Sequence, residues 1–165
     1  MARIEKTIEV AVPISVAYDQ WTQFEDFPKF MDGVQRVQQL DDRRLAWTAE
    51  VGGSTRHWTA DIIDQIPDTR IAWRSTSGAQ NDGAVDFRAI SVDKTRLDLV
   101  IEADPDGPLE TVGSALGFLD RRVEGDLVRF KEFIEARQAP TGAWTGEIHG
   151  GPVGADRGQR DGDRR

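Results

Sequence analysis

Residues 109–134 read LETVGSALGFLDRRVEGDLVRFKEFI. This stretch decides the fold, because it predicts a long helix with an apolar face that the rest of the chain must cover. Its apolar residues recur every three or four positions, which is the spacing of one face of an amphipathic helix. They are Leu109, Val112, Leu116, Leu119, Val123, Leu127, Phe130 and Ile134. Glu110 lies in the first turn and Lys131 lies near the end, which suits the helix macrodipole. We therefore predict one long helix whose apolar face is covered by another layer.

The residues before this helix provide that layer as β-strands. From Val34 to about Asp104, apolar and polar residues alternate in six successive runs, and turn signals separate the runs. Gly52-Gly53, Pro67-Asp68 and Asn81-Asp82-Gly83 are three of these signals. Because the connections are short, we expect the strands to be sequential antiparallel neighbours.

One more strand and two short helices precede these six strands. Apolar residues alternate from Ile4 to Val12, and Pro13 ends this strand. Two short helices follow, and Asp32-Gly33 closes the second one. The predicted fold class is therefore α+β, with a seven-stranded antiparallel sheet, a long C-terminal helix, and two short helices after the first strand.

The composition changes near Gln138. Residues 139–165 hold seven of the 16 glycines and show no apolar periodicity. We predict that residues 1–138 form one domain and that residues 139–165 form a flexible, glycine-rich tail. The candidates for a contact between this tail and the domain are Trp144, Ile148 and His149.

The composition also excludes several classes of function. A net charge of −8 argues against a nucleic-acid partner. The chain has no cysteine and only two histidines, His57 and His149, which excludes thiol catalysis, zinc–thiolate sites and a histidine-rich metal site. Neither a metal nor a cofactor is expected. No apolar run approaches the roughly 20 residues that span a bilayer, and no signal peptide is visible. We expect a cytoplasmic protein without an integral membrane segment, and a homodimer stays open.

The order of the elements and three segments resemble the START/Bet v 1-like superfamily, also called the SRPBCC or polyketide cyclase/dehydrase group. The segments are Trp21-x-x-Phe24-x-x-Phe27-Pro28-x-Phe30-Met31, Trp58-Thr59-Ala60-Asp61-Ile62 and Ile71-Ala72-Trp73-Arg74-Ser75. The resemblance covers residues 3–138. It implies the helix-grip fold, in which a curved antiparallel sheet holds the C-terminal helix and leaves a cavity between them. Geometry favours the same cavity, because a curved sheet cannot contact a straight helix along its whole length.

The predicted lining of this cavity is mainly aromatic. Strand alternation, the short helices and two helical glycines supply the candidate ligand-binding residues, which are Trp21, Phe27, Met31, Trp47, Trp58, Trp73, Phe87, Leu99, Gly113 and Gly117. Each group has an alternative interpretation. The tryptophans can simply fill the core, the glycines can allow close helix packing, and the aromatic residues of the short helices can plug the core instead of forming a lid.

Candidate catalytic groups are few. Tyr18 lies on the first short helix, Ser75 has the inward alternation of its strand, and Arg122 lies beside the apolar stripe of the long helix. A surface salt bridge is an alternative role for Arg122. His57 is expected to point outward, because it alternates with Trp58. No Ser-His-Asp arrangement, paired carboxylates or metal-ligand cluster is visible in the sequence.

Three functions fit these patterns. The protein can bind a small hydrophobic molecule, aromatic or polyketide-like, and act as a polyketide cyclase/dehydrase. It can instead be a non-catalytic carrier of a lipid or quinone, or a partner-binding protein whose cavity has no ligand. An acid or base within reach of the ligand would favour the first function, and a long, wholly apolar tunnel would favour the second.

Overall fold

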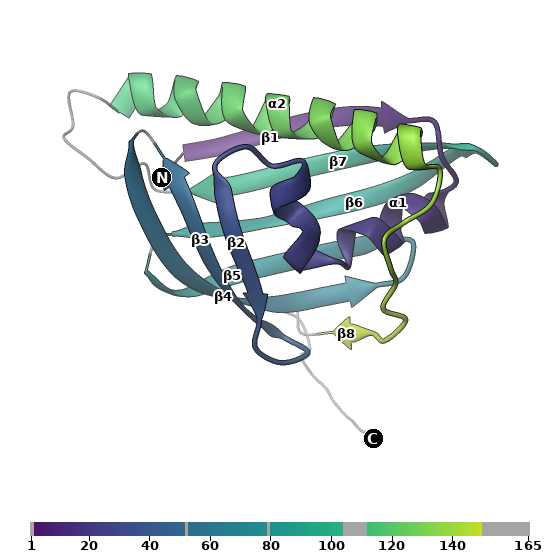
Figure 1. Ribbon diagram of the computed structural model, residues 1–165, viewed down its shortest axis with the longest axis horizontal. Helices are drawn as coiled ribbons and strands as arrows, with labels where there is room; N and C mark the ends of the chain where they lie inside the picture. The colour runs from purple at the N-terminus through teal and green to yellow at the C-terminus, as the bar shows by residue number, and fades with distance from the viewer. Residues whose placement is uncertain (1, 52, 79, 104–111, 150–165) are drawn as a thin grey trace.

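The computed structural model describes residues 2–51, 53–78, 80–103 and 112–149. These residues form one curled sheet, one long helix and two short helices (Figure 1). The bounds in chain order are β1 Ala2–Val10, α1 Ile14–Trp21, the 3-10 helix η1 Phe24–Lys29, β2 Val34–Gln39, β3 Arg44–Val51, β4 Ser54–Ile66, β5 Arg70–Gly78, β6 Asn81–Ser91, β7 Lys94–Ala103, α2 Val112–Arg137 and β8 Ile148–His149.

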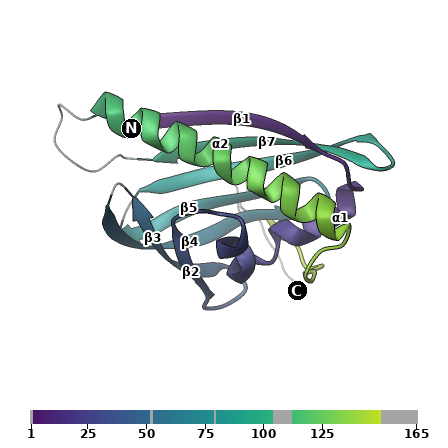
Figure 2. The same ribbon diagram turned by 45° about the horizontal axis from the view of Figure 1, so that its top comes forward.

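The sheet is antiparallel at every pairing. Its first seven strands follow the order β1-β7-β6-β5-β4-β3-β2, so that β2 to β7 lie beside their chain neighbours and β1 lies beside β7. Register shifts between Thr59 and Ala60 and between Ile62 and Asp64 add bulges to β4, and bulges increase the bend of a strand. Helix α2 crosses the open side of this curled sheet, close to β1 (Figures 1 and 2). The predicted helix-grip fold is confirmed.

A fully buried part of the core lies where α1 and η1 pack between the sheet and the C-terminal half of α2. Phe130 and Ile134 have no exposed surface there, and Phe30 is 1% exposed. The ring of Phe130 lies 5.2 Å from that of Phe30 and 5.4 Å from that of Trp21, measured between centroids. The predicted helical stripe is therefore buried from Val123 onward. Leu109 and the side chains of Val112 and Leu116 lie outside the described residues.

Residues 139–149 form a strap that packs against the domain. Thr141 accepts a hydrogen bond from Gln20 Nε2 at 3.0 Å, donates one to Asp26 Oδ2 at 2.6 Å, and its backbone N–H donates to Gln20 Oε1 at 2.9 Å. Ile148 is 4% exposed, and β8 pairs with β4. The prediction of a flexible tail from Ala139 is wrong for these residues, because a two-residue strand leaves no periodic pattern. Residues 150–165 lie outside the described residues.

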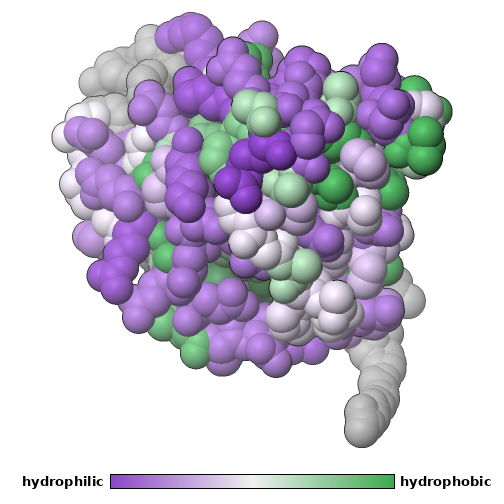
Figure 3. Space-filling model, turned by 45° about the vertical axis from the view of Figure 1, so that its right-hand side comes forward, coloured by the Kyte–Doolittle hydropathy of each residue, from purple (hydrophilic) through white to green (hydrophobic). Residues whose placement is uncertain are grey.

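The outer surface is mostly polar. The face shown in Figure 3 is mainly hydrophilic, and its hydrophobic residues form separate patches. Among the described residues, the exposed large hydrophobic side chains are Leu40, Ile90, Val92 and Val128. Neither α1 nor α2, in the part of the chain that the structure describes, is long and apolar enough to cross a membrane. The apolar surface of functional interest therefore lies inside the molecule.

Candidate ligand-binding pocket

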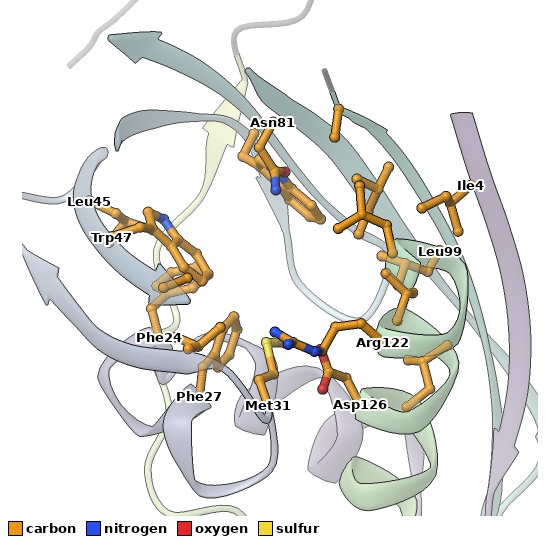
Figure 4. A pocket seen from close by; sticks show the side chains of 18 of the residues that line it. Ile4, Phe24, Phe27, Met31, Leu45, Trp47, Asn81, Leu99, Arg122 and Asp126 are labelled. Carbon is orange, nitrogen blue, oxygen red and sulfur yellow. The ribbon is translucent and has the colours of Figure 1, made fainter. Parts of the chain in front are cut away.

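A cavity of about 140 Å³ lies between the sheet and residues 119–127 of α2. Its wall is apolar almost throughout, and its apolar residues come from the sheet, both short helices and α2 (Figure 4). They are Ile4, Trp21, Phe24, Phe27, Met31, Val34, Leu45, Trp47, Ala49, Trp58, Ile62, Ile71, Trp73, Leu99, Ile101, Ala103, Leu119, Val123 and Leu127. The remaining residues of the described wall are polar, namely Asp32, Asn81, Arg122 and Asp126.

Two tryptophans make one wall of the cavity flat. Trp47 and Trp58 are directly opposite each other in the β3–β4 pair, where side chains on one face of the sheet meet. Their rings are stacked at 5.6 Å between centroids and 6° between planes. Phe27 of η1 packs against Trp47 at 5.8 Å. This arrangement presents extended aromatic surface to the cavity, which favours contact with a flat ligand.

The third tryptophan of the wall is positioned by a glycine on the neighbouring strand. Gly83 pairs with Trp73 across β5 and β6, and a Cβ atom on Gly83 would lie 2.5 Å from Cζ2 of that indole. Only glycine therefore leaves room for the ring at this place. Trp73 Nε1 donates to Asn81 Oδ1 at 3.0 Å. An indole N–H can only donate, so the Asn81 atom that faces it must be the amide oxygen and not the nitrogen. The NH₂ group of Asn81 is then free to donate elsewhere.

Most of the predicted ligand-binding residues line the cavity. They are Trp21, Phe27, Met31, Trp47, Trp58, Trp73 and Leu99. Phe87 does not line it, and its ring instead packs edge-on against Tyr18 at 5.4 Å. Gly117 does not line the cavity either. An α-helix turns by 100° per residue, so Gly117 lies about 160° around α2 from Leu119, which does line the cavity. The surroundings of Gly113 lie outside the described residues.

Two of the three predicted catalytic residues do not reach the cavity. Tyr18 is 1% exposed and packs in the core beside Phe87, and burial raises the pKa of its hydroxyl, which keeps it protonated. Ser75 links β5 to β6, because its backbone N–H and its hydroxyl donate hydrogen bonds to Asp82 Oδ1 at 2.9 and 3.3 Å. Neither Tyr18 nor Ser75 therefore lines this cavity.

The third predicted residue, Arg122, does line the cavity. Its Nη1 donates to the backbone oxygens of Asp32 at 3.1 Å and Glu50 at 3.0 Å, so that it ties α2 to the loop before β2 and to β3. Gly33 has a φ angle of +88°, and a Cβ atom there would overlap the Arg122 guanidinium. The glycine that predicted the end of the second short helix thus also makes space for this arginine.

Asp126 lies one turn after Arg122 and was missed by sequence reasoning. Its Oδ1 accepts hydrogen bonds from the Asp32 backbone N–H at 3.0 Å and from Arg129 Nη2 at 2.5 Å. Its Oδ2 has no hydrogen-bond partner among the residues that the structure describes. Burial raises the pKa of Asp126 to about 6, although Arg129 opposes this rise. A carboxyl group with this pKa can both accept and release a proton near neutral pH.

A sequence signal for Asp126 did exist. Val123 and Leu127 both belong to the apolar stripe of α2, and the position three residues after Val123 falls on the same face. An acidic residue there is expected to be buried rather than solvated. Figure 4 shows Arg122 and Asp126 projecting together from α2 on the side of Met31, with Asn81 on the opposite side of the cavity.

Comparisons with known proteins agree with this geometry. Residues 10–132 match the family described as "Polyketide cyclase / dehydrase and lipid transport". An uncharacterized 17.2 kDa protein in the melC2-rnhH intergenic region of Streptomyces lincolnensis is 45% identical over 149 residues, which cover 90% of this chain and 99% of that protein.

Two solved structures show the same fold at low sequence identity. A START superfamily protein from Mycobacterium smegmatis has a TM-score of 0.69 at 16% identity, covering 83% of this chain and 99% of that one. The Zhui aromatase/cyclase from Streptomyces sp. R1128 has a TM-score of 0.63 at 15% identity, covering 82% and 92%. With its helix-grip architecture, its sheet–helix cavity and the match over residues 10–132, this chain belongs to the polyketide cyclase/dehydrase and lipid transport family.

Proposed function

We propose that this protein binds a small aromatic molecule in the cavity between its sheet and α2. The observation that carries this proposal is the wall itself, in which Trp47, Trp58 and Trp73 surround about 140 Å³ of apolar space. An apolar space with a few converging polar groups is the usual form of a small-molecule site. Filling it with a ligand recovers dispersion contacts that the lining residues otherwise lack.

A cavity-filling variant tests this proposal. Ile101 lines the cavity from β7, whereas the neighbouring Val100 has the opposite strand alternation. We expect Ile101→Trp to weaken the binding of apolar probes at least tenfold, and the matched control Val100→Trp to leave their binding nearly unchanged. Toluene, naphthalene and palmitate are suitable probes of increasing size, measured by saturation-transfer NMR. The proposal is wrong if none of the probes binds the unchanged protein, or if both variants bind equally well.

A second candidate function, dehydration or cyclisation of the bound molecule, is favoured by the open Oδ2 of Asp126. In a dehydration, the Asp126 carboxylate removes a proton from the carbon beside a carbonyl group, and the electron pair forms a new double bond as the β-hydroxyl leaves. The same side chain then gives its proton to that hydroxide, so that one water molecule is lost. The positive charge of Arg122 would stabilise the enolate oxygen that develops.

The dehydration is tested with the aldol adduct of benzaldehyde and acetone, whose product absorbs as a conjugated enone. We expect Asp126→Asn to lower the rate by roughly 10²-fold or more, within the usual range for a general acid or base. Glu124→Gln is the matched control, because Glu124 lies on the same helix but is exposed and contacts Lys6. If the unchanged protein does not accelerate the reaction, or if Asp126→Asn is as active as the unchanged protein, the dehydration is overturned and the proposed binding stands.

A further inference from the structure

The size of the cavity limits the ligand more narrowly than its apolar character does. A volume of about 140 Å³ is close to the roughly 150 Å³ of an engineered apolar cavity that binds benzene, and lies below the roughly 300–1,000 Å³ of drug-sized sites. One aromatic ring with short substituents fills such a space. Three fused rings are larger than this space, and the wall residues Phe27 and Trp47 are packed against each other.

Each side of the cavity carries a polar side chain with an open hydrogen-bonding group. On the α2 side, Asp126 offers the oxygen Oδ2, which has no partner among the described residues. On the opposite side, the Asn81 oxygen is occupied by Trp73, and its NH₂ group has no hydrogen-bond partner in the described part of the chain. Figure 4 shows these two residues facing the cavity from opposite sides, with Arg122 beside Asp126. The open acceptor on the α2 side is therefore Asp126 Oδ2, which lies beside the Arg122 guanidinium, and the Asn81 NH₂ group is a donor on the opposite side.

We infer that the ligand is a single aromatic ring with a hydrogen-bond donor, such as a phenolic hydroxyl, directed at Asp126 and a carbonyl oxygen directed at Asn81. This inference rests on the proposed binding function and names its ligand class: a para-hydroxyphenyl ketone or a close relative. The Trp47–Trp58 pair contacts the ring. A carboxylate oxygen and an amide NH₂ group that are otherwise unpaired would each gain a partner.

Ligand size is tested on the unchanged protein by calorimetry with para-hydroxyacetophenone and with dihydroxyanthraquinone. We expect the one-ring compound to bind at least tenfold more tightly than the three-ring compound. If dihydroxyanthraquinone binds more tightly, the one-ring inference is overturned while the binding of an aromatic molecule stands. If palmitate binds more tightly than both aromatic compounds, the proposed function is overturned as well. If neither dihydroxyanthraquinone, palmitate nor any one-ring compound binds, the proposed function itself fails.

Ligand orientation is tested with two variants that preserve shape. Asp126→Asn keeps an oxygen for Asp32 and Arg129 but replaces the open oxygen by a donor, and Asn81→Asp keeps the oxygen for Trp73 but removes the donor. In the unchanged protein, para-hydroxyacetophenone should bind about tenfold more tightly than acetophenone and about tenfold more tightly than para-ethylphenol, which corresponds to one hydrogen bond each.

Each variant should abolish only one of these two preferences. Asp126→Asn should remove the preference for the hydroxyl group and leave the preference for the carbonyl group, and Asn81→Asp should do the reverse. Each variant thus serves as the folding control of the other. The orientation is overturned if either variant lowers both preferences equally, or if neither preference exists in the unchanged protein.

Discussion

The two halves of α2 have different surroundings, although one apolar stripe runs along both. From Phe130 to Ile134 the helix is packed against α1 and η1, and these two residues have no exposed surface. From Leu119 to Leu127 the same face borders the cavity, and it carries Asp126 between apolar neighbours. We call these regions the packed end and the cavity end.

The difference between the two ends shows how a fold separates stability from binding. At the packed end, Phe30 packs against Phe130, and the strap is hydrogen-bonded to α1 through Thr141 and Gln20. At the cavity end that space stays open, and the polar atoms of Arg122 and Asp126 are held by the backbone of Asp32 and by Glu50. Substitutions at the packed end should therefore affect folding, and substitutions at the cavity end should affect binding.

The largest effect is expected at the packed end. Phe130→Ala should lower the free energy of unfolding by about 3–5 kcal/mol, because it removes a fully buried ring that contacts Trp21 and Phe30. Leu119→Ala should lower it by only about 1 kcal/mol, because Leu119 is partly buried and borders open space. Urea denaturation of both variants measures the difference. Equal losses would mean that the two ends are packed alike.

The strap extends the packed end, and its removal should be the next largest effect. Ile148→Ala should lower the free energy of unfolding by about 2–4 kcal/mol, since Ile148 is 4% exposed and lies in β8. Truncation after Gln138 should destabilise the protein at least as much, because it also removes Thr141 from Gln20. Truncation after His149 is the control, since it keeps every strap contact described here. A melting temperature unaffected by truncation after Gln138 would show that the strap does not stabilise the domain.

The sequence was sufficient to predict the fold because its main signals are periodic. The alternation in the strands and the stripe from Val123 to Ile134 are repeated over many residues, so single errors do not change the result. The strap is not periodic. Its contacts depend on one threonine and one isoleucine, Thr141 and Ile148, and their partners on α1 and β4 are more than 80 residues away in the chain. No local pattern encodes such contacts.

The cavity residues were predictable to the extent that strand alternation holds. Trp47, Trp58 and Trp73 are on the predicted face, but Phe87 lies further along β6 and packs against Tyr18. Strand alternation gives the face of a side chain and not its position along the cavity. The sequence predicts Asn81 as part of a turn, whereas it is the first residue of β6. Its role depends on the hydrogen bond from Trp73, which no sequence pattern predicts.

At the cavity end, the burial of Asp126 should make stability depend on pH. Its pKa is raised from 3.8 to about 6 in the folded protein, so the unfolded chain releases this proton first as the pH rises. The contribution of Asp126 to the free energy of unfolding is therefore highest below pH 4, falls between pH 4 and 6, and stays lower above that range. The full difference is at most about 3 kcal/mol for a rise of roughly two pKa units.

The comparison with Asp126→Asn isolates this contribution from that of the other titrating groups. The free energy of unfolding of the unchanged protein, minus that of the variant, should decrease as the pH is raised from 4 to 7. Urea denaturation at several pH values measures it. A difference that stays constant or increases would mean that the Asp126 carboxyl is solvated, and the cavity end would lose its buried acid.

The smallest effect is expected on the far side of α2, where Gly117 belongs to neither end. A Cβ atom at Gly117 would meet only Arg121 Nη1, at 3.5 Å, which is an ordinary contact with the flexible end of a side chain. Gly117→Ala should therefore raise the free energy of unfolding by about 0.5–1 kcal/mol, the difference in helix propensity between the two residues. It should leave the binding of para-hydroxyacetophenone unchanged, because the position faces away from the cavity wall. Calorimetric titration and urea denaturation of this variant test both statements together. Weaker binding at unchanged or higher stability would mean that the ligand contacts the face of α2 that carries Gly117. The cavity described above would then not be the binding site.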